Sequence, residues 1–132
     1  MDETRTTDNP TILIVEDDLL LALDLEDMLR AHGFHVVRDV VSGEEGIAAA
    51  SNLAPHLILM DIRLRGGING LAAARFIRQT SRVPIIFLTA YADEASKQAA
   101  EALEAEGFLI KPIREEILLS TIRSALNSAQ TN

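Results

Sequence analysis

The stretch Leu57-Ile58-Leu59-Met60-Asp61 decides the fold, because four apolar residues in a row lead directly into a carboxylate. Two further runs have the same form: residues 12–15 lead into Glu16-Asp17-Asp18, and residues 85–88 lead into Thr89. Continuous apolarity is typical of strands buried on both faces, as in a parallel sheet covered by helices. Ligands of such sheets bind outside the carboxyl ends of the strands. We therefore expect these polar residues to converge at one edge of a parallel sheet.

Five strand-then-helix units follow one another without an internal linker, which predicts an α/β fold of three layers, with helices on both faces of the sheet. Ser42 and Glu45 form a capping box at one helix start. The expected strands span residues 11–15, 34–41, 57–60, 85–88 and 107–110, and the expected helices span about residues 19–32, 43–53, 70–79, 93–105 and 114–127. Residues 1–9 are expected to form a flexible N-terminal tail, residues 10–128 the domain, and residues 129–132 a C-terminal tail.

The bulk composition fits one globular domain and excludes several classes of function. The chain has 132 residues, a net charge of −8 and no cysteine. The negative charge repels phosphate backbones, which argues against nucleic-acid binding, and the lack of cysteine excludes disulfides and thiol catalysis. No apolar run approaches the roughly 20 residues of a membrane-spanning helix, and residues 1–10 lack the apolar core of a signal peptide. We therefore expect a cytoplasmic protein without membrane or nucleic-acid partners.

The converging carboxylates predict a divalent-cation site. The adjacent acids after the first strand and Asp61 after the third would repel one another unless a cation or a proton intervenes. Oxygen ligands without histidine or cysteine suit Mg²⁺, with Mn²⁺ as an alternative ion. An aspartate carboxylate can accept a phosphoryl group and form an acyl phosphate. Thr89 supplies a hydroxyl and Lys111 an ammonium at further strand ends, so we expect a phosphoryl group to be neutralised there.

The set Glu16-Asp17, Asp61, Thr89 and Lys111-Pro112, in this order and spacing, resembles the receiver domain of two-component response regulators. The resemblance covers roughly residues 11–126. It implies a flavodoxin-like (βα)5 sandwich whose parallel five-stranded sheet has the order 2-1-3-4-5, and a Lys111–Pro112 bond that is commonly cis. It also implies a CheY-like, stand-alone phosphoprotein that transmits signals in a two-component phosphorelay and is not a turnover enzyme.

By the same resemblance, Asp61 would accept the phosphoryl group from a phosphohistidine of a histidine kinase or a histidine phosphotransfer protein. The protein would catalyse its own phosphorylation and autodephosphorylation at this residue. Mg²⁺ would bind Glu16, Asp17 and Asp61, together with the backbone carbonyl of Arg63. Glu16 stands where an aspartate is commoner, a departure that the family tolerates.

Further residues around the acceptor receive roles from the resemblance. Thr89 would hydrogen-bond the phosphoryl oxygen, and Lys111 would pair with it. Thr89 and Phe108 would form a switch, in which the aromatic ring turns inward when the threonine shifts. Arg63 and Tyr91 lie at the rim, two residues after the acceptor and the threonine. Bulky groups there would obstruct the water that hydrolyses an acyl phosphate.

The signal is expected to leave through a protein contact. The expected surface comprises the helix at about residues 93–105, the strand at 107–110 and the last helix. Lys97, Glu101 and Arg123 are expected on this surface. It would bind a downstream protein target, or a second copy of the chain in a homodimer.

Three alternatives from other classes stay open. A magnesium-dependent aspartyl-phosphate phosphatase or phosphotransferase would use the same chemistry, although enzymes of the haloacid dehalogenase type place the acceptor after their first strand. A flavin-binding module would need a phosphate loop where Glu16-Asp17-Asp18 would repel the FMN phosphate. A degenerate receiver would act only as a protein-binding module.

Overall fold

The computed structural model describes residues 9–131, in which five parallel strands alternate with five helices. In chain order the elements are β1 (Thr11–Val15), α2 (Leu19–Ala31), β2 (His35–Val40), α3 (Gly43–Leu53), β3 (Leu57–Asp61), α4 (Gly70–Arg78), β4 (Ile85–Thr89), α5 (Glu94–Ala102), β5 (Gly107–Ile110) and α6 (Glu115–Thr131). No helix within this part of the chain is long and apolar enough to cross a membrane.

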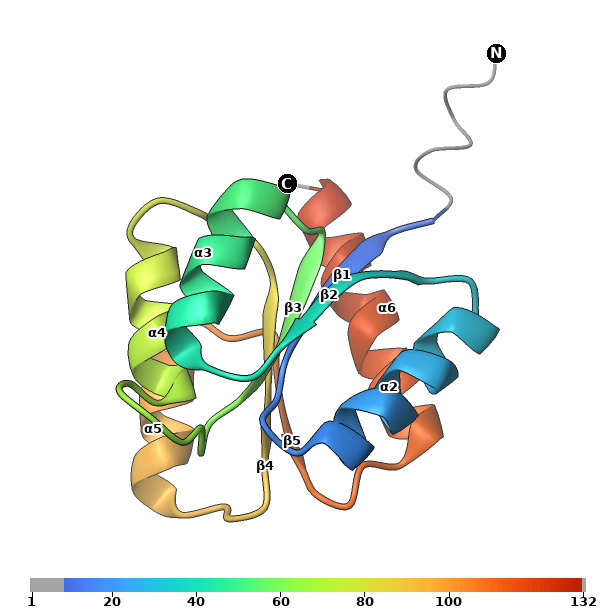
Figure 1. Cartoon of the computed structure of the whole chain (residues 1–132). Helices are drawn as coiled ribbons and strands as arrows, with labels where there is room; N and C mark the ends of the chain where they lie inside the picture. The colour runs from blue at the N-terminus through green and yellow to red at the C-terminus, as the bar shows by residue number, and fades with distance from the viewer. Residues whose placement is uncertain (1–8, 132) are drawn as a thin grey trace.

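The sheet has the order β2-β1-β3-β4-β5, with every pairing parallel, which confirms the expected topology. Helices α2 and α6 cover one face of the sheet, and α3, α4 and α5 cover the other (Figure 1). Because all strands run in the same direction, their carboxyl ends share one edge. That edge carries the polar residues that follow the apolar runs.

The central strands are buried on both faces, as their continuous apolarity predicted. All residues of β3 and β4 are buried. Alternate side chains face opposite layers, because successive strand residues point to opposite sides. Ile12 and Ile14 pack in the cluster that includes α2 and α6, whereas Leu13 and Val15 pack in the cluster that includes α3, α4 and α5.

Local capping explains where two of the helices begin beside this edge. The Asp18 carboxylate accepts hydrogen bonds from the backbone N–H groups of Leu20 and Leu21 and so caps α2. The predicted capping box of α3 is present: Glu45 N–H donates to the Ser42 hydroxyl at 3.1 Å, and the Glu45 carboxylate accepts from the backbone just before it. These caps fix the direction in which each helix leaves the sheet edge.

Helix ends differ from the sequence prediction in two places. Helix α5 ends at Ala102 rather than near residue 105, because Glu104 has a left-handed φ of 59°. Helix α6 continues to Thr131, because no glycine or proline follows residue 127 to end it. The expected C-terminal tail is therefore wrong for residues 129–131, which are helical. The expected N-terminal tail lies outside the described residues, except for residue 9.

Candidate functional site

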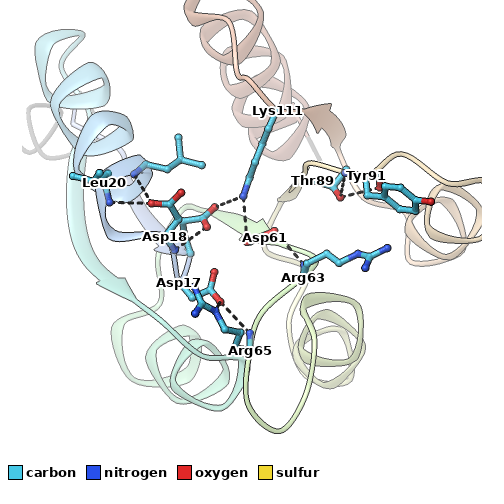
Figure 2. Close-up of polar contacts among 11 residues, drawn as sticks. Asp17, Asp18, Leu20, Asp61, Arg63, Arg65, Thr89, Tyr91 and Lys111 are labelled. Carbon is cyan, nitrogen blue, oxygen red and sulfur yellow. Dashed lines mark hydrogen bonds and ion pairs between the residues drawn. The ribbon is translucent and has the colours of Figure 1, made fainter.

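The polar residues predicted to converge do so at the carboxyl edge of the sheet. Glu16 follows β1 directly, Asp61 and Thr89 are the last residues of β3 and β4, and Lys111 follows β5. Figure 2 shows that Lys111 reaches across the edge toward Asp61. The strand ends thus position these groups, because β1, β3, β4 and β5 are neighbours in the sheet.

Three carboxylates crowd together at this edge. One oxygen from each of Glu16, Asp17 and Asp61 lies within 4.8 Å of the others. Glu16 is 1% exposed and Asp61 is 3% exposed, so little water screens their charges. Like charges that lie this close together and are shielded from water favour a bound cation or a proton.

Lys111 supplies part of the compensating charge. Its ammonium Nζ lies 3.0 Å from Glu16 Oε1 and 3.3 Å from Asp61 Oδ2. Burial raises the pKa of Glu16 to about 7, and the neighbouring Asp61 adds to this, although Lys111 acts in the opposite direction. Burial alone would lower the pKa of Lys111, but hydrogen bonding and charge from Glu16 and Asp61 outweigh it and raise that pKa. The Lys111–Pro112 peptide bond is cis.

The donor set fits a hard divalent cation. Glu16 Oε1 is buried, and its one close polar contact within the described part of the chain is the Lys111 ammonium at 3.0 Å. That ammonium is shared with Asp61, so one positive charge faces two buried carboxylates, and a further cation would offset the remaining negative charge. Carboxylates from Glu16, Asp17 and Asp61 are the ligand type that Mg²⁺ prefers. The ligand role of the Arg63 backbone carbonyl stays a prediction.

Close contacts fix both the carboxylate and the backbone carbonyl of Asp61. Its Oδ1 accepts the backbone N–H of Arg63 at 3.1 Å, and its Oδ2 accepts from Lys111. Gly70, the first residue of α4, packs so closely that a Cβ there would lie 2.0 Å from the Asp61 carbonyl oxygen. Only glycine permits this approach. This role was not predicted from the sequence, in which the available signal was a glycine immediately after the Asn69 helix cap.

Thr89 is buried at the edge, but its hydroxyl is engaged elsewhere. The hydroxyl donates to the Tyr91 carbonyl at 2.9 Å and accepts the Tyr91 N–H at 3.0 Å. No hydrogen bond joins it to Asp61 among residues 9–131. The two rim residues stack on each other, with the Arg63 guanidinium carbon 4.8 Å from the centre of the Tyr91 ring. Both project away from Asp61 on one side of the site (Figure 2).

Phe108 is half-buried and lies beside Phe87 in the β4–β5 register. It lines a hollow of about 120 Å³ together with Lys97 and Glu101 of α5, which places these two residues on the expected output surface. Arg123 instead lines a separate cavity beside His32 and Phe34, toward α2. Its predicted place on the output surface is therefore wrong, because it occupies the other flank of α6.

Arg65 is a site residue that the sequence analysis did not find. Its backbone N–H and its side-chain Nε both donate to Asp17 Oδ2, each at 3.1 Å (Figure 2). The two residues lie 48 positions apart in the sequence. The only local signal was a second arginine in the loop after Asp61.

The comparisons with known proteins agree with this geometry. The family model described as the response regulator receiver domain matches residues 12–123. The chain is 37% identical over 118 residues to Protein PilH of Pseudomonas aeruginosa, covering 87% of this chain and 96% of that protein. It is 34% identical over 121 residues to the transcriptional regulatory protein AfsQ1 of Streptomyces coelicolor, covering 92% of this chain and 53% of that one. The chain thus spans about half the length of several curated relatives it matches.

A solved structure gives the same result. The signal receiver domain of a modulated diguanylate cyclase from Desulfovibrio desulfuricans has a TM-score of 0.88 and 33% sequence identity, and the match covers 94% of this chain and 98% of that one. The likeness therefore extends over nearly the whole of both chains.

Proposed function

Because the chain belongs to the response regulator receiver domain family, whose members are phosphorylatable signalling switches and generally not turnover enzymes, we propose that Asp61 is its phosphoryl acceptor. The supporting observation is the convergence of the Asp61 carboxylate with Glu16, Asp17 and the Lys111 ammonium at one sheet edge. A carboxylate flanked by a cation site and an ammonium is suited to accept a phosphoryl group, because both positive groups offset the negative charge of the incoming oxygens.

The proposed donor is a phosphohistidine on a histidine kinase or a histidine phosphotransfer protein. An Asp61 carboxylate oxygen attacks the phosphorus, an O–P bond forms and the N–P bond of the donor breaks, which returns the histidine with a proton from solvent. Glu16, Asp17, Asp61 and the Arg63 carbonyl would hold Mg²⁺, or Mn²⁺ in its place. The bound ion supplies charge neutralisation for the phosphoryl oxygens.

Phosphorylation would act as a switch by changing the contacts that Lys111 and Thr89 make in the unphosphorylated site. Lys111 would exchange part of its pairing with Glu16 and Asp61 for the phosphoryl oxygens. The Thr89 hydroxyl would leave the Tyr91 backbone and turn toward the phosphoryl group. Phe108 borders a hollow beside β5, so its ring has space to reorient. Each step biases an equilibrium between two arrangements of the same elements.

Two surfaces would serve partners in this proposal. Leu19, Leu20 and Leu23 are 65%, 80% and 55% exposed at the start of α2, next to the site. Such an apolar patch suits the docking of the phosphodonor protein. The face formed by α5, β5 and α6 would contact a downstream protein, or a second copy of the chain.

Incubation with acetyl phosphate and Mg²⁺, read by intact mass, tests the acceptor. We expect a gain of one phosphoryl group that Asp61→Asn abolishes and EDTA prevents. The matched control is Asp18→Asn, which keeps the helix cap of α2 and should keep the gain. Absence of any gain in the wild type, or an undiminished gain in Asp61→Asn, rules out Asp61 as acceptor.

The same mass measurement, followed over time, tests the rim residues. Shortening Arg63 and Tyr91 to alanine should speed the loss of the phosphoryl group, as their rim position predicts.

A further inference from the structure

Arg65 binds the one carboxylate of the cluster that Lys111 does not contact. Lys111 pairs with Glu16 and Asp61, whereas Asp17 Oδ2 receives both donors from Arg65. The three carboxylates are thus shared between two cationic side chains of the protein. A divalent cation at this edge would compete with these side chains for the same three carboxylates.

We propose that Arg65 is a built-in competitor of the divalent cation, which holds Asp17 until the ion displaces its guanidinium and thereby sets the affinity of the site. This inference rests on the proposed metal-binding function of Glu16, Asp17 and Asp61. Arg65 is a positioning residue in this role, because it acts through Asp17 and not on the phosphoryl group. The guanidinium and the ion are both positive, so they cannot share Asp17 Oδ2 without repulsion.

The arginine side chain is free to leave. Its side chain is 85% exposed, whereas that of Asp17 is 14% exposed, so release moves only the arginine into water. The backbone N–H of Arg65 makes a separate hydrogen bond to the same oxygen. Displacement of the guanidinium therefore does not require the chain to move at residue 65.

The loop that carries Arg65 has further points of attachment. Ile68 packs against Gly43 so closely that a Cβ on the glycine would lie 2.7 Å from it, and Gly67 packs in the same way against the Glu44 carboxylate. These contacts hold residues 67–68 against the start of α3. Loss of the Arg65 side chain should therefore alter the charge at Asp17 without unfolding the loop.

Calorimetric titration of the full chain with Mg²⁺ tests the competition. We expect Arg65→Ala to bind Mg²⁺ about two- to fivefold more tightly than the wild type, the change that removal of one partly exposed ion pair produces. Arg65→Lys keeps the charge but loses the planar fork, so its affinity should lie between the two. The matched control is Arg82→Ala, which removes an exposed arginine paired with Glu104 at the opposite edge of the sheet. It makes the same change in net charge and should leave the affinity unchanged.

Nuclear magnetic resonance supplies a readout that a merely structural role would not move. The Arg65 Nε–H signal of the wild type should shift toward that of a solvent-exposed arginine as Mg²⁺ saturates the site. Equal or weaker affinity in Arg65→Ala, or an Nε–H signal unmoved at saturation, overturns the competitor role while leaving the metal site intact. Absence of Mg²⁺ binding in both the wild type and Arg65→Ala overturns the metal site itself, and this inference with it.

Discussion

At the scale of single residues, the buried carboxyl group of Glu16 makes the stability of the domain depend on pH. Its pKa is raised from 4.5 to about 7, first by burial and then by the nearby Asp61. Between these two values the folded protein holds a proton that the unfolded chain has released. The free energy of unfolding therefore falls as the pH rises through this window, by at most about 3 kcal/mol. Below pH 4.5 both states are protonated, and above about 7 both are ionised.

Glu16→Gln should remove this dependence, because the amide stays neutral at every pH. In EDTA, urea unfolding should show that the variant gains stability relative to the wild type between about pH 5 and about pH 8. Glu101→Gln, an exposed glutamate of α5, is the control and should follow the wild type across the same range. A difference between Glu16→Gln and the wild type that does not change with pH would contradict the assigned pKa.

At the scale of elements, Arg78 joins the end of α4 to two loops. Its guanidinium donates to the backbone carbonyls of Val83, Leu103 and Glu104, and also to the Glu106 carboxylate. The side chain is only 10% exposed. These bonds satisfy the carbonyls of two connections at the edge of the sheet opposite the candidate site.

Arg78→Ala should lower the free energy of unfolding by about 2–4 kcal/mol, because it removes hydrogen bonds to three backbone carbonyls and to the Glu106 carboxylate. Urea denaturation measures the change. Arg75→Ala, an exposed arginine on the same helix, should change stability by no more than about 0.5 kcal/mol. An equal loss in both variants would show that the hydrogen bonds of Arg78 add nothing specific to stability, because alanine favours helix more than arginine does and cannot itself cause a loss.

Features that depend on a local sequence pattern were predicted, whereas contacts between distant segments were not. The apolar run before Asp61 predicted both its strand and its place at the sheet edge, because burial leaves a local pattern. Arg65 and Arg78 were not predicted, since their partners lie far along the chain or are backbone atoms of other loops. Gly70 reads as an ordinary first residue of a helix until its contact with the Asp61 carbonyl is known.

The orientation of individual side chains is a second feature that the sequence did not predict. Thr89 was predicted at the strand end, and it lies there, but its hydroxyl faces the Tyr91 backbone. That choice depends on one side-chain rotation, which no periodicity encodes. Arg123 was misplaced for a related reason, because the sequence of an amphipathic helix does not state which of its two flanks meets which neighbour. Long elements and strand ends are thus predictable here, while rotations and cross-element pairs are not.

At the scale of the whole molecule, the crowded carboxylates connect metal binding to the stability of the entire domain. Mg²⁺ bound only by the folded chain should stabilise it by about 1.4 kcal/mol at a free concentration about ten times Kd, because the unfolded chain does not bring the three acids together. For a domain of this size that corresponds to a rise in Tm of about 3–6 °C. Thermal unfolding at increasing Mg²⁺ concentration measures it. Asp17→Asn should lose the rise, whereas Asp27→Asn, an exposed aspartate in the middle of α2, should keep it. A rise of equal size in both variants would mean that Mg²⁺ only screens the net charge of −8.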